Sequence, residues 1–369
     1  MSLPTTTRAA VLTAHGEDLT MQDVPLPDTV EPGAALVEIS CTTLCGTDIE
    51  IWSGKMSFPG MLPMILGHEM VGHVVAVGEG TVDALGRPVS VGDRIGWSER
   101  TCGHCYGCLV LREPVACSNR GYGFTQRSDV PPYSISGLAQ YAYVTPGAQK
   151  LLLPEAVKDT WASMAGCAAK TVLRAFSRVG GIRPASRVVV QGAGALGIFA
   201  TAVASISGAG QVITVGAPDS RLEMARRFGA TDTVSISLGS QGIVERVMEL
   251  TGGHGADHVF DFAGAPTVGA EAIDMAAQRG TFAIVGSTGF GMAEILLSAI
   301  MGKELTVAGS LNGDISDYYR AVEFFETFAA RFPWDELFSE TVGLGDASAS
   351  IRNMAEFGEI KAVIDPRKP

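Results

Sequence analysis

Cysteine residues are grouped in one short stretch of this sequence, with a spacing that suggests metal chemistry. The segment TCGHCYGC contains Cys102, Cys105 and Cys108, and Cys117 follows in the same stretch. Such a group can hold an iron–sulfur cluster or a zinc ion, or the cysteines can form disulfides. The chain has 7 cysteines, an odd number, and its first residues lack the apolar segment of a signal peptide. We therefore expect a cytoplasmic protein with reduced thiols, which argues against disulfides.

A second set of potential metal ligands is spread over three distant segments. Cys45 lies in CTTLCGTD, His68 in LGHEMVG, and Cys167 in MAGCAAK. A catalytic zinc ion takes three protein ligands of nitrogen or sulfur type and keeps a fourth position open for water or substrate. These three side chains have the right chemistry for such a site if the fold brings them together. Cys41, in contrast, is expected to be a buried core residue.

A glycine-rich turn further along the chain predicts a dinucleotide-binding site. The segment VVVQGAGALG has the G-x-G-x-x-G spacing between an expected strand and an expected helix. Gly192 permits the tight turn, Gly194 lets the backbone approach a pyrophosphate, and Gly197 allows close packing of helix on sheet. The free N–H groups at the helix N-terminus favour that anion. The expected coenzyme contacts in this turn are Gly192, Ala193, Gly194, Ala195, Leu196 and Gly197.

The residue at the end of the next expected strand helps to determine whether NAD or NADP is preferred. An acidic residue there would bind the adenosine 2′-hydroxyl of NAD, but the segment VITVGAPDSRL has Gly216 at this position. Arg221 is the first basic residue after it, and Asp219 between them disfavours a 2′-phosphate if it faces the site. We expect Gly216 and Arg221 to lie next to the coenzyme. NAD is the expected coenzyme and NADP the alternative, and Gly216→Asp is expected to widen the preference for NAD.

The composition argues against several classes of partner. Apolar residues make up 46% of the chain and charged residues 18%, as in a well-buried globular enzyme. The net charge of −12 repels nucleic acid and anionic membranes. No apolar run is long enough to span a bilayer. We therefore expect a small-molecule substrate and neither nucleic acid nor membrane as a partner.

The hydrophobic pattern changes along the 369 residues and predicts two domains. The first 160 residues show short apolar runs between Gly and Pro breaks, which is typical of a β-rich domain. After about residue 165, six apolar strands alternate with helices, which predicts an α/β fold with a doubly wound parallel sheet of Rossmann type. A helix at 318–332 and the tail after it are expected to return to the first domain. The predicted domains are 1–163 with 312–369, and 164–311.

The motifs CGTD and GHE-x2-G, the four-cysteine lobe and the Rossmann half together resemble the zinc-containing medium-chain alcohol dehydrogenases, from about residue 8 to 365. The CG[TS]D form is typical of the polyol, threonine and secondary-alcohol branch. The resemblance implies a GroES-like catalytic domain and hydride transfer between a secondary alcohol, or its ketone, and NAD(P). It also implies a homodimer or homotetramer.

The resemblance further implies a role for each matching residue near the catalytic zinc ion. The residues that match zinc ligands are Cys45, His68 and Cys167. Glu69 matches a carboxylate that can approach or replace a ligand. Thr47 matches the hydroxyl that hydrogen-bonds the alcohol. Asp48 matches a buried carboxylate behind the metal.

Other matches concern the coenzyme and the proton. The residues that match the surroundings of the nicotinamide ring are Thr171, Val285, Gly286 and Ser287. Lys361 matches a basic contact to the pyrophosphate. Glu50 stands where the branch commonly has a histidine that ends a proton relay. Glu50 either accepts that proton or is a solvated surface residue.

The resemblance also bears on the first cysteine group. An iron–sulfur cluster there would give no role to Cys45, His68 or Cys167, and the family has a four-cysteine lobe at this place. We therefore expect a structural zinc ion, and two zinc ions per chain. The residues expected to hold the structural ion are Cys102, Cys105, Cys108 and Cys117.

Two other functions stay open. A zinc-independent NADPH quinone or enone reductase of the same superfamily would not need the second ligand set, and a non-catalytic zinc scaffold would not need a coenzyme turn. Metal analysis separates the three functions. The loop at 123–137 carries too little charge to indicate a phosphorylated or carboxylated substrate, so a neutral secondary alcohol or ketone is expected.

Overall fold

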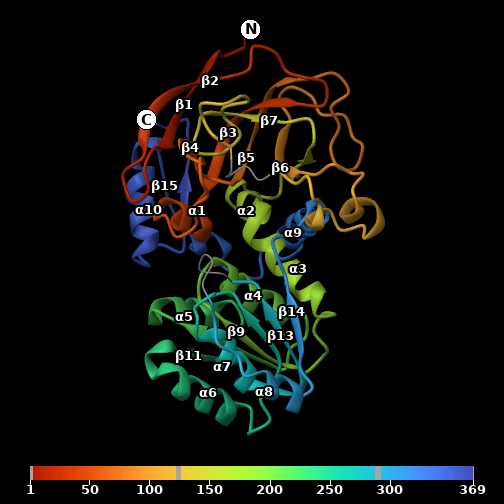
Figure 1. The fold of residues 1–369 in the computed structure, drawn as a ribbon, viewed down its shortest axis with the longest axis vertical. Helices are drawn as coiled ribbons and strands as arrows, with labels where there is room; N and C mark the ends of the chain where they lie inside the picture. The colour runs from red at the N-terminus through yellow and green to blue at the C-terminus, as the bar shows by residue number, and fades with distance from the viewer. Residues whose placement is uncertain (1–2, 122–125, 287–291, 369) are drawn as a thin grey trace. The chain divides into compact units, whose positions relative to one another are not determined.

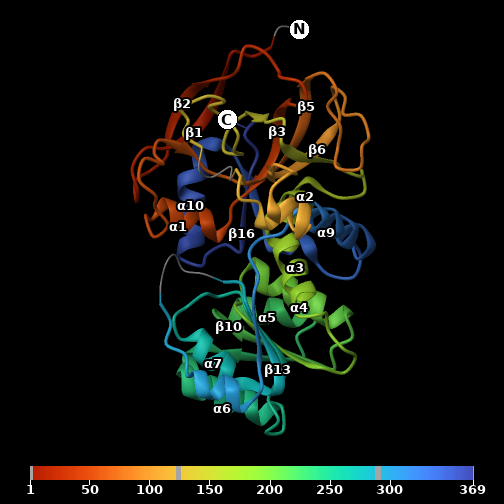
Figure 2. The same ribbon diagram turned by 45° about the vertical axis from the view of Figure 1, so that its right-hand side comes forward.

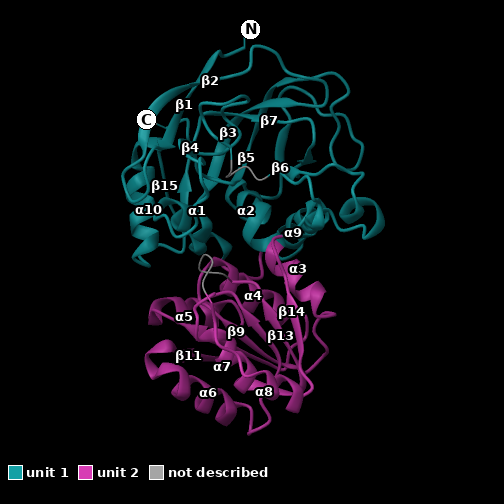
Figure 3. Ribbon diagram, in the orientation of Figure 1, with its two compact units in different colours: residues 1–170, 313–329, 334–369 teal, residues 171–312, 330–333 magenta. Residues whose placement is uncertain are grey.

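The computed structural model describes residues 3–121, 126–286 and 292–368. The chain forms two compact units, which Figure 3 distinguishes by colour. Unit 1 comprises residues 1–170, 313–329 and 334–369, and unit 2 comprises residues 171–312 and 330–333. Among the described residues, no helix has the length and apolar character that crossing a membrane requires.

Unit 1 is built mainly from strands. They are β1 (Thr6–Leu12), β2 (Thr20–Pro25), β3 (Ala35–Thr43), β4 (Met64–Ile65), β5 (Glu69–Val77), β6 (Arg94–Arg100), β7 (Tyr141–Val144), β8 (Ala148–Leu152), β15 (Phe338–Val342) and β16 (Lys361–Ile364). Its helices and helical turns are α1 (Gly46–Trp52), η1 (Tyr106–Val110), η2 (Pro114–Ala116), α2 (Asp159–Met164), η4 (Ala165–Ala169), α9 (Ile315–Thr327), η6 (Trp334–Leu337), η7 (Leu344–Asp346) and α10 (Ala347–Ala355).

The larger sheet of unit 1 has the strand order β15-β16-β3-β5-β6-β8, and β7 pairs with β3 outside this path. Almost every side chain of the central strand β3 is buried, including the polar Thr42 and Thr43 at its end. The first unit ends at residue 170 and not at residue 163, because η4 packs against β5, β6 and α9 of the same unit. The second boundary lies between residues 312 and 313, one residue beyond the expected position.

Unit 2 alternates strands and helices, as the sequence predicts (Figure 1; Figure 2). The strands are β9 (Arg187–Gln191), β10 (Gln211–Gly216), β11 (Asp232–Ser235), β12 (Ala256–Asp261), β13 (Ala276–Ile284) and β14 (Thr306–Gly309). The helices are α3 (Lys170–Arg178), which starts at the boundary, α4 (Ala195–Ile206), α5 (Asp219–Arg227), the turn η5 (Ile236–Leu238), α6 (Gly239–Leu250), α7 (Val268–Met275) and α8 (Leu297–Gly302).

The sheet of unit 2 has the order β11-β10-β9-β12-β13-β14, and every neighbouring pair is parallel. The expected doubly wound Rossmann sheet is therefore confirmed. The chain leaves β9 in one direction and returns to its other side at β12, so the strand order reverses between these two strands. Ligands of such sheets bind at this switch point, beyond the carboxyl ends of the strands. The glycine turn after β9 lies there.

Candidate active site

The second ligand set assembles at one end of the larger sheet in unit 1. Cys45 is the N-cap of α1 just after β3, and His68 directly precedes β5. Since β3 and β5 are antiparallel neighbours, the two segments meet. Cys167 comes from η4, which packs on β5. The ligand atoms of Cys45, His68, Glu69 and Cys167 all lie within 4.8 Å of one another.

Asp48 holds this end of the sheet together from behind. Its side chain is fully buried, and its Oδ1 lies 3.2 Å from His68 Nδ1 and accepts from the Gly67 N–H at 3.0 Å. Its Oδ2 accepts from the Cys45 N–H at 2.9 Å. Burial alone would lower the pKa of His68, but the Asp48 carboxylate raises that pKa well above its usual value. The contact to Nδ1 leaves Nε2 of His68 as the nitrogen for a metal. Asp48 is thus buried next to His68, and its place behind a metal ion stays a prediction.

Glu69 is a buried carboxylate with strong partners on one oxygen only. Its Oε2 accepts from Thr43 Oγ1 at 2.6 Å and lies 2.5 Å from Lys361 Nζ. Its Oε1 has no hydrogen-bond partner among the described residues. Burial raises the pKa of Glu69 to about 7, against the opposing effect of the Lys361 ammonium. A buried oxygen without a partner beside two thiols and an imidazole fits a metal site.

Lys361, for which the resemblance implies a contact to the coenzyme pyrophosphate, forms a buried ion pair within unit 1. Its side chain is 1% exposed, on β16, where the ammonium pairs with Glu69. The cause is sheet order, since β16 and β5 are both neighbours of β3. The contact to the pyrophosphate stays a prediction. Thr43, Ser163 and this lysine are the partners of Glu69 that sequence reasoning missed; Ser163 Oγ donates to the Glu69 carbonyl at 2.7 Å.

The remaining residues expected around the metal lie on α1. Thr47 and Glu50 are half-buried there, within one helical turn of Asp48. Cys41 is buried in β3, and burial raises the pKa of its thiol above its usual range. It is not a member of either potential metal-binding group. The hydrogen-bonding role of Thr47 and the proton-accepting role of Glu50 stay predictions.

The first cysteine group forms a second cluster in unit 1. The sulfur atoms of Cys102, Cys105, Cys108 and Cys117 all lie within 4.8 Å of one another, and all four thiols are free. The backbone N–H groups of Cys108 and Ser118 lower the pKa of Cys105 to about 5. N–H groups directed at sulfur favour the thiolate, which is the form that binds metal. Four convergent sulfurs suit a closed tetrahedral zinc site.

The glycine turn of unit 2 has the geometry that its spacing predicts. Gly192 has φ +112°, in the region that favours glycine. A Cβ on Gly197 would lie 1.8 Å from the Gly192 carbonyl oxygen, so only glycine lets α4 start this close to the turn. A Cβ on Gly194 would meet nothing within 4 Å, which leaves open space over the N-terminus of α4. Ala193, Ala195 and Leu196 complete the turn.

Gly216 ends β10 directly beside this turn. A Cβ there would lie 2.5 Å from Ala193 Cβ and 2.9 Å from Ala193 N. Gly216 therefore packs closely against the glycine turn, and a larger side chain at this position has no room unless Ala193 moves. Gly216→Asp therefore requires a shift of Ala193, and its expected effect on the preference for NAD stays a prediction. Arg221 lies on α5 and is 8% exposed, and burial lowers the pKa of its guanidinium.

The residues expected near the nicotinamide ring belong to unit 2. Thr171 is buried in the first turn of α3. Val285 and Gly286 follow β13, and their N–H groups donate to the Asp261 carbonyl at 3.1 and 2.8 Å. This places them at the carboxyl ends of β12 and β13, on the same edge of the sheet as the glycine turn. Ser287 lies outside the described residues.

Comparisons with known proteins agree with this geometry. Residues 31–155 match the family of alcohol dehydrogenase GroES-like domains, and residues 195–327 match the family of zinc-binding dehydrogenases. The chain is 32% identical to 5-exo-hydroxycamphor dehydrogenase of Pseudomonas putida over 97% of its own length and 98% of that protein. It is 31% identical to L-threonine 3-dehydrogenase of Pyrococcus abyssi over 80% of each chain.

Solved structures show the same fold over the whole chain. An alcohol dehydrogenase from Thermotoga maritima superposes with a TM-score of 0.89 at 26% identity, covering 98% of this chain and 100% of that one. A zinc-binding dehydrogenase from Sinorhizobium meliloti, solved with bound NADP, gives a TM-score of 0.83 at 27% identity, with the same coverage. The chain therefore belongs to the zinc-containing medium-chain alcohol dehydrogenases and is an oxidoreductase that transfers hydride between an alcohol or ketone and NAD(P).

Proposed function

We propose that this protein is a secondary-alcohol dehydrogenase whose catalytic zinc ion is held by Cys45, His68 and Cys167. One observation carries the proposal: three distant segments place two sulfurs and an imidazole nitrogen within 4.8 Å of one another. When bound, zinc lowers the pKa of a hydroxyl at its open position and NAD(P) accepts the hydride. Oxidation of the alcohol to a ketone would release a hydride, which the coenzyme would take up, and a hydroxyl proton, which would pass by way of Glu50 to solvent.

The chain's own residues prepare this reaction. Asp48 fixes the ring of His68, and the Lys361 ammonium stabilises a negative charge on the buried Glu69. The Cys45 sulfur accepts a hydrogen bond from the Cys167 thiol and lies near the Lys361 ammonium. Both effects, opposed by burial, lower the pKa of Cys45 well below its usual value. A thiolate is the form of cysteine that binds zinc. Thr47 is proposed to hydrogen-bond the substrate hydroxyl and Glu50 to receive its proton.

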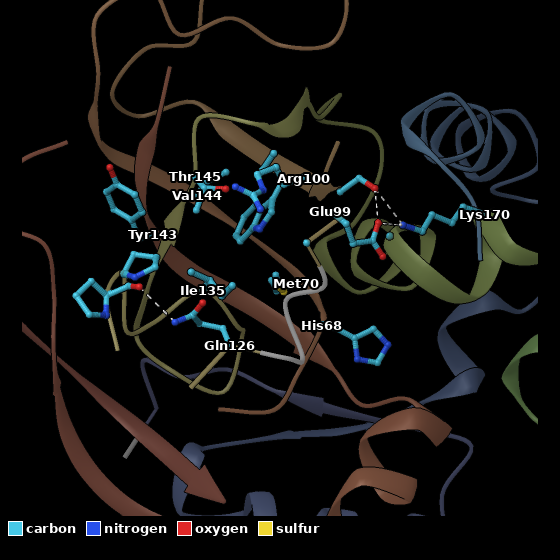
Figure 4. A pocket seen from close by; sticks show the side chains of 17 residues that line it. His68, Met70, Glu99, Arg100, Gln126, Ile135, Tyr143, Val144, Thr145 and Lys170 are labelled. Atoms are coloured by element: carbon cyan, nitrogen blue, oxygen red, sulfur yellow. Dashed lines mark hydrogen bonds and ion pairs between the residues drawn. The ribbon is translucent and has the colours of Figure 1, made fainter. Parts of the chain in front are cut away.

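A cavity of about 410 Å³ next to His68 is the proposed substrate pocket (Figure 4). Its size is in the range of small-molecule sites. Met70, Trp97 and Ile135 provide apolar walls. The similarity to a dehydrogenase named for a hydroxycamphor supports a substrate with a bulky apolar group around the reacting carbon.

The cluster of Cys102, Cys105, Cys108 and Cys117 is proposed to hold a structural zinc ion, which gives two zinc ions per chain.

NAD is the proposed coenzyme, with a kcat/KM that is higher than that for NADP by a modest factor. The reason is that Asp219 in the first turn of α5 adds a negative charge near the expected site of the adenosine ribose. The proposed division into a catalytic and a coenzyme-binding domain follows the two compact units. A cytoplasmic location suits the six thiolate ligands, which must stay reduced and unpaired.

Metal analysis and kinetics test the proposal together. The purified protein is expected to contain two zinc ions per chain and to oxidise cyclic secondary alcohols with a higher kcat/KM for NAD than for NADP. His68→Ala is expected to lose turnover and one zinc ion while NAD still quenches intrinsic fluorescence with an unchanged Kd. Turnover by a His68→Ala sample free of catalytic zinc contradicts the proposed metal site. A clear preference for NADP contradicts only the coenzyme assignment.

The homo-oligomeric state is proposed from the edge of the parallel sheet. Among the described residues, β14 has a partner strand on one side only, and nearby apolar side chains are exposed, among them Leu297 at 74% and Met301 at 76%. An unprotected apolar edge strand favours pairing with a second copy about a twofold axis. Light scattering is expected to give a dimer or tetramer, and Met301→Lys to shift it toward the monomer. Ile236→Lys, at an exposed apolar position elsewhere in unit 2, is the control; a monomeric unmodified protein contradicts the proposal.

A further inference from the structure

The cavity beside His68 contains charged side chains from two segments of unit 1. Glu99 and Arg100 come from the end of β6, and Lys170 follows η4 (Figure 4). None of the three lies in the 123–137 loop from which the sequence suggested an uncharged pocket. The net charge of the pocket therefore depends on these three side chains and on their ion-pair partners.

Glu99 is already compensated by two cations. Its Oε2 lies 3.2 Å from Lys170 Nζ and 3.3 Å from Arg120 Nη2, and it accepts from Ser98 Oγ at 2.7 Å. The Lys170 side chain is 1% exposed. Burial would raise the pKa of Glu99, but the two cations hold that pKa well below its usual range, so the carboxylate stays charged. Two cations on one carboxylate leave a surplus positive charge behind the pocket wall.

Arg100 adds a further cation on the exposed side of the same pocket. No carboxylate pairs with its guanidinium in the described ranges, and the residues at 122–125 and 287–291 have no acidic side chains. Its side chain runs past two glycines: a Cβ on Gly147 would lie 2.5 Å from Arg100 Cγ, and one on Gly121 would lie 3.3 Å from Nε. These glycines make room for the side chain at the pocket. In Figure 4, Arg100 and His68 are at separate places around the cavity.

We propose that the pocket recognises a carboxylate on the substrate, bound by Arg100, while the hydroxyl-bearing carbon lies next to His68. Three cations against one carboxylate give this wall a positive field inside a protein of net charge −12. A guanidinium binds a carboxylate through two parallel hydrogen bonds, which favours this anion among single-charged groups. The substrate class is thus a secondary hydroxy acid, or its oxo acid, with an apolar part against Trp97 and Ile135. The inference rests on the proposed function, since it concerns the same pocket.

Oxo acids and their methyl esters form matched pairs that test the proposal. The pairs are 4-oxopentanoate, 5-oxohexanoate and 6-oxoheptanoate with their esters, each reduced by NADH to the corresponding alcohol. For at least one chain length, kcat/KM is expected to be about tenfold or more higher for the acid, as a charge-assisted hydrogen bond allows. The best chain length reports the separation between Arg100 and the reacting carbon.

Variants assign the preference to Arg100. Arg100→Gln is expected to remove the ratio between acid and ester, and Arg100→Lys to keep part of it. Arg320→Gln is the control, because Arg320 is an exposed cation of unit 1 that does not line the pocket. An equal kcat/KM for acid and ester at every chain length in the unmodified protein overturns the proposal. A preference for the acid that persists in Arg100→Gln also overturns it.

Calorimetry separates this inference from the proposed function. Titration of the zinc-loaded protein with each of the three oxo acids and with its methyl ester measures recognition without turnover. Tighter binding of an acid that disappears in Arg100→Gln supports the inference even if no ketone is reduced, in which case the proposed function fails. Equal binding of acid and ester at all three chain lengths contradicts the inference even where neutral ketones are reduced.

Discussion

The buried pair between Lys361 and Glu69 is the residue-level feature on which the candidate metal site depends most. Both side chains are 1% exposed or less, and the two charged atoms lie 2.5 Å apart. A buried pair is weak as a source of stability, but removal of one partner leaves an uncompensated charge. This asymmetry makes the pair testable.

Lys361→Met is expected to destabilise the protein by about 3–5 kcal/mol, because it leaves the Glu69 carboxylate buried without its cation. Urea unfolding of the metal-free protein measures the change. Lys368→Met removes a lysine from the exposed end of the same segment and is expected to change the free energy of unfolding by less than about 0.5 kcal/mol. Equal effects of the two substitutions would show that the pair has no structural importance.

At the scale of elements, two glycines of the turn between β9 and α4 have different roles: Gly197 allows close packing, and Gly194 leaves space for the coenzyme. Gly197→Ala places a Cβ 1.8 Å from the Gly192 carbonyl oxygen, so it is expected to lower stability by about 2 kcal/mol or more. Gly194→Ala meets open space in the free protein. It is expected to fold normally and to weaken coenzyme binding by about tenfold, since the pyrophosphate needs that space. Thermal unfolding and fluorescence titration with NADH measure the two effects, and a common pattern for both variants contradicts the distinction.

The four-cysteine lobe is an element with too little apolar burial to hold its own shape. The turns η1 and η2 carry exposed apolar side chains, including Tyr106 at 67% and Leu109 at 65%. Cys108→Ser is expected to lose one zinc ion and to lower Tm, because metal binding supplies folding free energy here. Cys41→Ala, at a buried cysteine outside both clusters, is expected to keep both zinc ions. A Cys108→Ser protein with two zinc ions and an unchanged Tm contradicts the structural site.

At the scale of the whole molecule, Lys150 links global stability to pH. Its side chain is 2% exposed and donates to the carbonyls of Thr145 and Ala148 at 3.3 and 2.8 Å. Burial lowers the pKa of Lys150 from 10.5 to about 8. The native state therefore loses this proton at a lower pH than the unfolded chain. The buried charge costs up to about 3 kcal/mol below pH 8, and this cost disappears as the pH rises to about 10.5.

Lys150→Met removes the buried charge and therefore its cost to stability. It also leaves two carbonyls without a donor, which reduces the gain in stability by about 1 kcal/mol. The variant is expected to be more stable than the unmodified protein by about 1–2 kcal/mol at pH 7, and to lose this advantage by pH 10. Urea unfolding at both pH values measures the difference. Lys55→Met, at an exposed lysine, is expected to show no such change. A pH-independent difference for Lys150→Met contradicts the assigned pKa.

The sequence by itself determined the features that depend on neighbouring residues. The roles of Gly192 and Gly197 follow from a turn of six residues, and the strands of unit 2 follow from apolar runs that a parallel sheet buries on both faces. The metal-ligand candidates were found because cysteine and histidine have few other uses in such motifs. Family resemblance then related Cys45, His68 and Cys167, although no local pattern connects them.

The tertiary structure decided what depends on sheet register and on contacts between distant segments. Lys361 meets Glu69 only because β16 and β5 lie on either side of β3, and Arg100 enters the pocket of His68 only because β6 follows β5 in the sheet. Gly216 is constrained by Ala193 across two parallel strands. Side-chain periodicity states which face of a strand is buried, but not which strand lies next to it. The charge partners of the site therefore came from the fold alone.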